Sequence, residues 1–128
     1  ARDRQGQERL VPVGSVARRW LKHYLASGRP ALTEDEEGPL FVSARGHQLS
    51  RQAVWQLLKR QGEVAGLASP VAPQTLRNSC AAHLLDNQAD YLVVQQLLGR
   101  QLPGAPVVPL SRVLAVYNRC HPRAKEED

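Results

Sequence analysis

Apolar residues return at helical spacing along the first part of the chain, and they predict a helix over residues 15–26. Its inward face would carry Val16, Trp20 and Tyr24. A glycine at position 28 and a proline at position 30 follow this segment. We expect them to end the helix, because proline offers no backbone N–H and clashes with the preceding turn.

A second helix is predicted over residues 51–65, with Val54, Leu57 and Leu58 on its inward face. Ser50 precedes this helix, and its hydroxyl can accept a hydrogen bond from a first-turn N–H group. Similar start and stop signals, among them Pro73, Asp90, Gly99 and Ser111, predict three further helices. These helices are expected at residues 74–86, 91–98 and 111–121.

The segments between the helices predict short strands and loops. Two apolar runs bounded by turn residues, 8–13 and 40–42, predict short strands. An acidic loop occupies residues 34–38, and the three prolines of residues 101–110 exclude a helix there and predict an irregular loop. The whole pattern predicts one domain over residues 1–128, mainly α with a few short β-strands, in the α+β class.

Composition and charge narrow the classes of partner. The 128 residues are 42% hydrophobic, which is enough for one packed core. The formal net charge is +5, and residues 38–125 carry ten Lys or Arg and three acidic residues, a local charge of +7. Such a basic body favours a polyanion such as nucleic acid as the partner.

The remaining chemistry of the sequence is plain. Cys80 and Cys120 lie in no metal-ligand spacing, and two cysteines in a chain of this length indicate free thiols in a reducing compartment. We expect no metal site and no cofactor. No apolar run reaches the length of a membrane span, and residues 1–10 lack the apolar core of a signal peptide. The sequence therefore predicts a cytoplasmic protein with no membrane partner.

Several segments occur in an order that resembles the catalytic domain of tyrosine recombinases of the Xer and phage-integrase type. They are residues 8–12 (ERLVP), 40–46, 49–55, 73–78 (PQTLRN), 82–99 and 116–124. The resemblance covers nearly the whole chain and implies the fold of DNA breaking-rejoining enzymes. It begins at the family's β-hairpin, so we expect the C-terminal part of that domain, incomplete at its N-terminus.

The resemblance also implies where the catalytic positions lie. Members of the family cleave one DNA strand with a tyrosine, and they stabilise the charged phosphorus centre with two arginines, a lysine and two histidines. Arg77 matches the second arginine, whereas Gln74 and Arg100 stand where the two histidines are expected. Arg4 falls near the lysine of the hairpin. Neither glutamine nor arginine can exchange a proton at neutral pH, so proton transfer is predicted to be lost.

The nucleophile is predicted to be missing as well. A gapless count along the family pattern reaches Pro109 at the position of the tyrosine, inside the proline-rich loop. Tyr117 is the nearest substitute, but its place in the last helix matches a packing tyrosine. Tyr24 and Tyr91 are expected to be core or half-buried residues, and His83 matches a structural histidine of a core helix.

These features favour a DNA-binding domain derived from a tyrosine recombinase, without strand cleavage of its own. The partner would be the phosphate backbone of duplex DNA, and the candidate DNA-binding residues are Arg4, Arg51, Lys59, Arg77 and Arg100. One alternative is a subunit of a mixed recombinase assembly whose tyrosine comes from another subunit. Another is a protein-interaction module in which the apolar stripe of the last helix, Val113, Val116 and Tyr117, docks on a second copy or a related recombinase.

Overall fold

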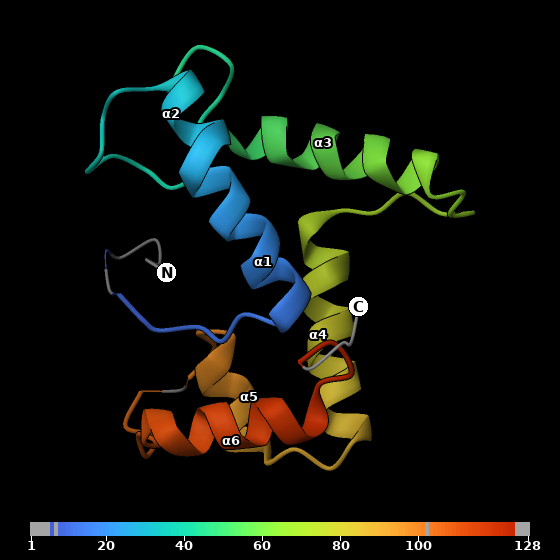
Figure 1. Cartoon of the computed structure of the whole chain (residues 1–128). Coiled ribbons are helices and arrows are strands. Elements are labelled where there is room, and N and C mark those ends of the chain that lie inside the picture. Colours follow the sequence, from blue (N-terminus) through green and yellow to red (C-terminus); the bar gives the residue numbers. More distant parts are fainter. Residues whose placement is uncertain (1–5, 7, 102, 125–128) are drawn as a thin grey trace. The chain divides into compact units, whose positions relative to one another are not determined.

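A computed structural model describes residues 6, 8–101 and 103–124 of the chain (Figure 1). The chain forms two compact units. We call residues 1–17 and 77–128 the terminal unit, and residues 18–76 the central unit. That the whole chain acts as one domain stays a prediction.

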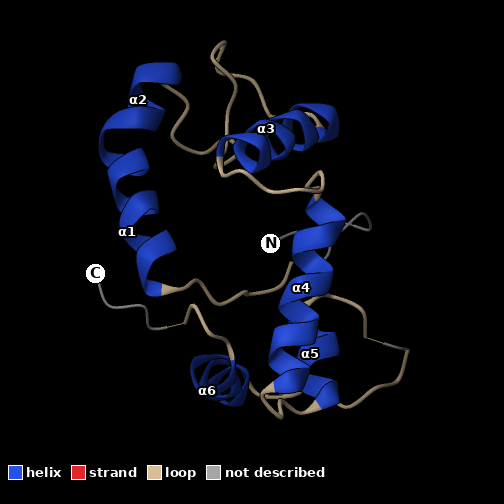
Figure 2. Cartoon of the chain, turned by 90° about the vertical axis from the view of Figure 1, so that its right-hand side faces the viewer, coloured by secondary structure: helices blue, strands red, loops and turns tan. Residues whose placement is uncertain are grey.

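The described residues form helices joined by loops, and this confirms the mainly helical fold (Figure 2). The helical elements are α1 (Ser15–His23), a π-helical turn (Tyr24–Gly28), α2 (Arg29–Leu32), α3 (Arg51–Val64), α4 (Pro73–Asp86), α5 (Tyr91–Leu97) and α6 (Leu110–Cys120). No helix in this described part is long and apolar enough to cross a membrane.

The two predicted strands are not formed by the described residues. Residues 40–42 contribute only an isolated antiparallel bridge between Val42 and Gln48. The residues between them form a tight turn, in which Ser43 N–H donates to His47 O at 2.7 Å. In the other predicted strand Glu8 forms a single bridge and residues 9–13 are assigned to no strand, and Pro12 could not donate to a ladder in any case.

The predicted end of the first helix is wrong, because the helical path continues past Gly28 to Leu32. A π-helical turn precedes Pro30, and in it Arg29 N–H donates to Tyr24 O, five residues back. This wider turn accommodates Pro30 in the helical path, because proline has no backbone N–H that needs an acceptor in the preceding turn. Trp20, expected on the inward face, is 66% exposed.

Tyr24 and Arg29 hold the loop that follows in the central unit. The Tyr24 hydroxyl donates to Leu40 O at 2.9 Å, and its ring stacks on Phe41 with ring centroids 5.8 Å apart. The Arg29 guanidinium is buried and donates from Nε and Nη2 to Pro39 O, at 3.3 and 3.0 Å. These bonds satisfy a buried charge with a backbone acceptor.

Helix α3 begins where the sequence predicted. Ser50 Oγ accepts a hydrogen bond from Ala53 N–H at 3.1 Å, and Gly66 just beyond the helix has a positive φ of 74°. Val54 and Leu58 are half-buried, but Leu57, also expected inward, is exposed.

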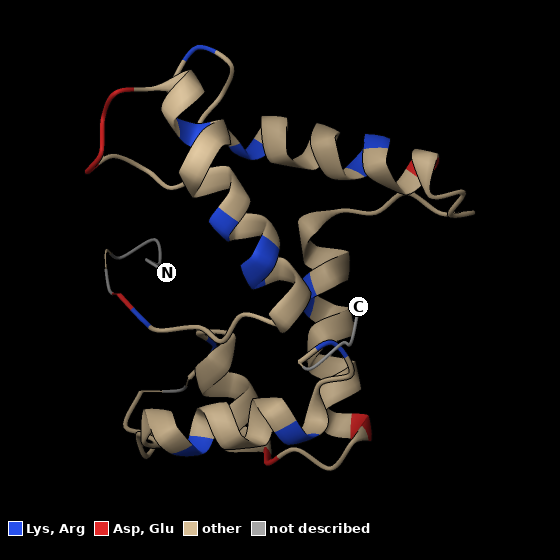
Figure 3. Cartoon of the chain, in the orientation of Figure 1, with Lys and Arg blue, Asp and Glu red and all other residues tan. Residues whose placement is uncertain are grey.

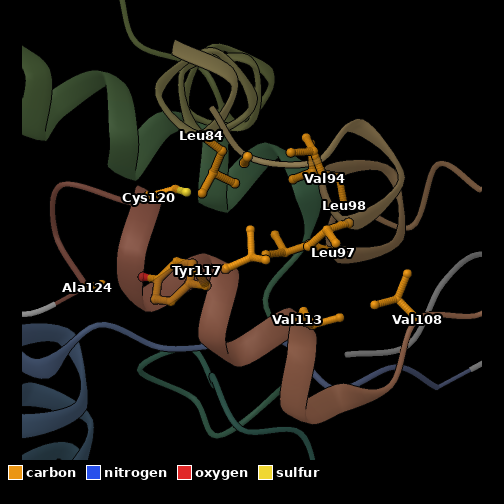
Figure 4. Packing of buried hydrophobic residues seen from close by; sticks show 12 residues of the cluster. Leu84, Val94, Leu97, Leu98, Val108, Val113, Tyr117, Cys120 and Ala124 are labelled. Carbon is orange, nitrogen blue, oxygen red and sulfur yellow. The ribbon is translucent and has the colours of Figure 1, made fainter. Parts of the chain in front are cut away.

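The core of the terminal unit lies where α4, α5 and α6 meet (Figure 4). Leu84 of α4, Val93 of α5 and Cys120 of α6 are its most deeply buried side chains. The apolar stripe of α6 faces this core, and its buried members are Val113, Val116, Tyr117 and Cys120. The stripe that could have docked on a neighbouring subunit is thus covered within its own unit.

Helix α6 begins one residue earlier than predicted. Pro109 occupies the N-cap position, and Ser111, which was expected to cap the helix, already lies inside it. The N-terminal end of α5 shows the expected cap, because Asp90 Oδ1 accepts from Leu92 N–H at 2.9 Å. The other carboxylate oxygen of Asp90 lies 3.3 Å from Arg112 Nη2, which ties α6 to α5.

His121 follows α6 and carries a pH-dependent contact. Its Nδ1 accepts a hydrogen bond from Arg123 N–H at 3.1 Å, and its ring stacks on Tyr117 at 5.0 Å. A protonated ring has no acceptor nitrogen, so this arrangement requires neutral histidine. Burial lowers the pKa of His121, and the neighbouring His83 and Arg123 lower it further.

We therefore expect the terminal unit to lose stability as pH falls. Between the lowered pKa of His121 and the ordinary histidine value of about 6.5, the unfolded chain binds more protons than the folded one. The contribution is present in full above about pH 6.5 and disappears as pH drops through the folded pKa. Thermal unfolding from pH 8 to pH 5 measures this, and His121→Gln should flatten the profile while the exposed His47→Gln should not. An unchanged profile in His121→Gln would contradict the assignment.

Candidate nucleic-acid interface

The C-terminal end of α5 is closed by two nested backbone hydrogen bonds. Arg100 N–H donates to Gln95 O at 2.8 Å, and Gly99 N–H donates to Gln96 O at 3.1 Å. Gly99 has a φ of 68°, the left-handed conformation that this helix ending requires and that glycine adopts without strain. The ending leaves two further carbonyls of the last turn, those of Leu97 and Leu98, to find other donors.

Two arginine side chains supply those donors. Arg77 of α4 donates from Nη2 to Leu98 O, and Arg9 donates from Nε to Leu97 O at 3.4 Å. The Arg9 guanidinium also lies directly over Gly99, since a Cβ placed there would be 2.5 Å from Arg9 Nη1. Both side chains are therefore fixed by the backbone of α5.

Arg100 brings a third guanidinium to the same helix end. Its Nη2 lies 3.4 Å from Asn78 Oδ1, one position after Arg77 on α4. Three arginines from three separate segments thus meet at the end of α5. We call Arg9, Arg77 and Arg100 the arginine cluster.

The cluster concentrates positive charge. Partial burial lowers the pKa of Arg77, and the charges of Arg100 and Arg9 lower it further. Arginine remains protonated in spite of such a shift, so the three charges repel one another permanently. An anion placed among them would relieve this repulsion and could accept several N–H groups at once, as a phosphate does.

The other predicted site residues belong to the central unit or lie outside the described residues. Gln74 is exposed in the first turn of α4, in the part of the helix that belongs to the central unit. Arg51 and Lys59 lie on α3 of the same unit, at helical spacing with Trp55, and Lys59 Nζ sits 5.4 Å from the centre of that ring. Arg4 lies outside the described residues.

Figure 3 shows where the lysines and arginines of the described chain lie in each unit. In the central unit they recur along α1 and α3, while the acidic residues gather in the loop after α2. In the terminal unit they appear on α4, on α6 and in the segment before α1. The acidic residues are thus gathered in one loop of the central unit, whereas in the terminal unit acidic and basic residues alternate, as in the Asp90–Arg112 pair.

None of the described tyrosines is placed as an obvious nucleophile. Tyr117 is only 8% exposed, and burial, with a further contribution from Cys80, raises the pKa of its hydroxyl. The Tyr24 hydroxyl is bonded to Leu40, as a half-buried packing residue should be. The prediction that Tyr91 is a core or half-buried residue is wrong, because Tyr91 is 61% exposed. His83, which the resemblance matches to a structural histidine of a core helix, is exposed and lies edge-on to His121.

The sequence reasoning missed Arg9 as a site residue. In the sequence Arg9 is one residue of the segment 8–12, and nothing in that segment shows that its side chain reaches a helix end 88 residues away. The available signal was indirect: a glycine at the end of α5 permits close approach of another group. The described residues contain no group of three or more His, Cys, Asp or Glu arranged to hold a metal ion.

Comparisons with known proteins point in one direction. The model of the phage integrase family matches residues 1–101. The chain is similar to proteins named tyrosine recombinase XerD: 50% identical over 95 residues in Ralstonia nicotianae, covering 73% of this chain and 31% of the relative. For Mycobacterium tuberculosis H37Rv the identity is 43% over 130 residues, covering 97% and 42%. For Corynebacterium glutamicum it is 40% over 122 residues, covering 92% and 40%.

The chain thus spans about two fifths or less of the length of these relatives. No solved structure matches it. The family model ends at residue 101, so the proline-rich loop and α6 lie beyond the matched region.

Proposed function

Because the chain belongs to the phage integrase family, we propose that it is the DNA-binding part of a tyrosine recombinase or integrase-like protein and cleaves no strand by itself. Its ligand is the phosphate backbone of duplex DNA. It acts in the cytoplasm, where such DNA is accessible, with no metal or cofactor.

The arginine cluster is the observation that carries this proposal. Arg9 and Arg77 are held at one helix end by bonds to backbone carbonyls, and the Arg100 guanidinium lies 3.4 Å from Asn78 Oδ1, so their charges are placed before any ligand arrives. A preorganised cationic site loses little side-chain entropy on binding, and Arg guanidinium groups suit phosphate oxygens geometrically. Arg51 and Lys59 of the central unit would add contacts to the phosphates of the DNA.

The proposed lack of cleavage rests on chemistry that the chain does not supply. Gln74 and Arg100 cannot transfer protons at neutral pH, although both can bind phosphate oxygens. Pro109 stands at the start of α6 and offers no hydroxyl. The site can therefore hold a phosphate, but neither attacks it nor protonates a leaving oxygen.

The rival reading as a pure protein-interaction module is less well supported. Its feature was the apolar stripe of α6, and Val113, Val116 and Tyr117 are buried in the core of their own unit. A role as the non-cleaving subunit of a mixed recombinase assembly is compatible with DNA binding. It would show as cleavage by a complete partner that increases when this chain is added.

We expect the chain to bind duplex DNA with little sequence preference and with an affinity that falls steeply with salt. Binding releases counterions from the phosphates, so each neutralised phosphate contributes a slope of about −0.9 to the plot of log affinity against log salt. Arg77→Ala should weaken binding by about 1–3 kcal/mol, the cost of a charge-assisted contact. Fluorescence anisotropy between 50 and 200 mM salt measures both effects.

Arg119→Ala is the matched control, because it removes the same charge from the exposed side of α6, away from the cluster. Affinity that does not change with salt would overturn the proposal, and so would equal losses in the Arg77 and Arg119 variants.

A further inference from the structure

We propose that residues 121–124 form a strap that holds the start of α1 and that opens when His121 takes up a proton. We call these residues the C-terminal strap. The strap and the residues it contacts all belong to the terminal unit, so its opening can be measured without DNA. Opening would release the start of α1 while the core between α4, α5 and α6 stays formed.

The strap is attached to the start of α1 by backbone contacts. Ala124 O accepts a hydrogen bond from Ser15 N–H at 3.3 Å. Arg123 O lies so close to Gly14 that a Cβ placed on this glycine would be 2.4 Å from the oxygen. Ala124 is only 6% exposed and belongs to the apolar core of the unit. The strap therefore supplies an acceptor for one of the first N–H groups of α1, which have no partner within the helix.

Two hydrogen bonds to His121 set the shape of the strap. The ring nitrogen Nδ1 accepts from Arg123 N–H at 3.1 Å, and the backbone oxygen of His121 accepts from Ala124 N–H, also at 3.1 Å. The ring is held in place by Tyr117, on which it stacks with centroids 5.0 Å apart. His121 thus positions both residues whose carbonyls contact the start of α1.

Protonation of His121 would turn the acceptor Nδ1 into a donor. Two N–H groups would then face each other, and the bond to Arg123 N–H would be lost. The titratable groups that the described contacts place at the ring are Tyr117 of α6, His83 of α4 and Arg123. None of them is negatively charged near neutral pH. Burial lowers the pKa of His121, and His83 and Arg123 lower it further, so the strap is closed at neutral pH and opens below the ordinary value of about 6.5.

Hydrogen exchange at the Ser15 amide, followed by NMR on the whole chain, tests the strap, because this N–H is the donor to Ala124 O. The protection factor of Ser15 should fall about fivefold or more between pH 8 and pH 5, the factor for one hydrogen bond worth about 1 kcal/mol. The amide of Ala89 donates to Leu84 O at 2.9 Å in the core of the same unit. It should remain the better protected of the two at pH 5, which shows that the unit is still folded.

Three variants separate the strap from other effects of pH. Gly14→Ala should leave the Ser15 amide poorly protected at both pH values, because the added methyl group displaces Arg123 O. His121→Gln should remove the pH dependence, since glutamine does not titrate. His83→Gln should keep the dependence and move its midpoint to higher pH, because it removes a neighbour that lowers the pKa of His121. His47→Gln, at an exposed position of the central unit, is the matched control and should change nothing.

Constant protection of Ser15 from pH 8 to pH 5 in the unmodified chain would overturn the inference. A pH dependence that survives in His121→Gln would do the same, and so would full protection in Gly14→Ala. If His121→Gln does not fold by circular dichroism, His83→Gln decides between the outcomes. An upward shift of the midpoint supports the strap, whereas an unchanged midpoint or a lost dependence contradicts it. DNA binding is measured separately, so the strap and the proposed function can each fail alone.

Discussion

Replacing Gln96 by leucine should lower the free energy of unfolding of the terminal unit by about 2–4 kcal/mol. The Gln96 side chain binds both backbone groups of Val108: its Nε2 donates to Val108 O and its Oε1 accepts from Val108 N–H, each at 2.7 Å. Val108 is only 8% exposed and packs in the core. Leucine fills a similar volume but leaves a buried N–H and a buried C=O unpaired, at a cost of about 1–3 kcal/mol for each group.

The neighbouring Gln101 provides the control. Its Nε2 donates to Gln96 Oε1 at 3.1 Å, but the residue is exposed. Gln101→Leu should therefore change stability by less than about 0.5 kcal/mol, as surface substitutions usually do. Urea unfolding measures the stability of both variants. The dependence of the free energy of unfolding on urea concentration should be the same as in the unmodified chain. Equal stability of the Gln96→Leu and unmodified chains would show that the loop is not fixed by this side chain.

The fixation of Val108 bears on position 109, where the gapless count along the family pattern predicts the nucleophile. Val108 immediately precedes Pro109, and Pro109 begins α6, whose apolar side chains are buried in the core. Position 109 is thus held from both sides. A residue placed there has little freedom to reach toward a phosphate.

Introducing a tyrosine at this position should accordingly restore no cleavage. Pro109→Tyr supplies a hydroxyl, but Gln74 and Arg100 still provide no group that can exchange a proton. General acid–base catalysis alone is worth about 10²- to 10⁴-fold in rate, and groups that act as a unit are not recovered one at a time. We expect no covalent protein–DNA adduct above background from Pro109→Tyr on a nicked duplex.

Adding Gln74→His and Arg100→His to Pro109→Tyr is the informative comparison, since it restores the three positions together. An adduct from Pro109→Tyr alone, removed again by Pro109→Phe, would show that proton transfer is supplied by some other group. The absence of adduct in that variant, with DNA binding retained, agrees with the proposal.

Several helix boundaries could be predicted from local capping signals, although Ser111, a predicted cap, lies inside α6. Ser50 and Asp90 accept hydrogen bonds from first-turn N–H groups, and Gly66 and Gly99 adopt positive φ just beyond their helices. Each of these interactions joins residues a few positions apart, so the sequence contains both partners.

Features that depend on distant partners could not be predicted. The apolar run at 40–42 looks like a strand, yet it is held by Tyr24 and Arg29 rather than by a ladder. Pro30 looks like a helix terminator, but the π-helical turn before it accommodates its missing N–H. Local propensity indicated the wrong outcome in both cases because tertiary contacts decided it.

The candidate site shows the same division. Resemblance indicated Arg77 and Arg100, but only the fold shows that the two meet at the end of α5. Arg9 joins them through a hydrogen bond to Leu97 O, a residue 88 positions away in the sequence, and no local pattern predicts such a contact.

A nicked suicide duplex, which traps a covalent phosphotyrosyl intermediate, tests the central claim most directly. The unmodified chain is mixed with this duplex at low salt, and one sample is divided between a native gel and a denaturing gel. We predict a shifted complex on the native gel that disappears with salt, and no protein–DNA band on the denaturing gel. A denaturation-resistant band that is lost in Tyr117→Phe would contradict the account and would make Tyr117 a relocated nucleophile.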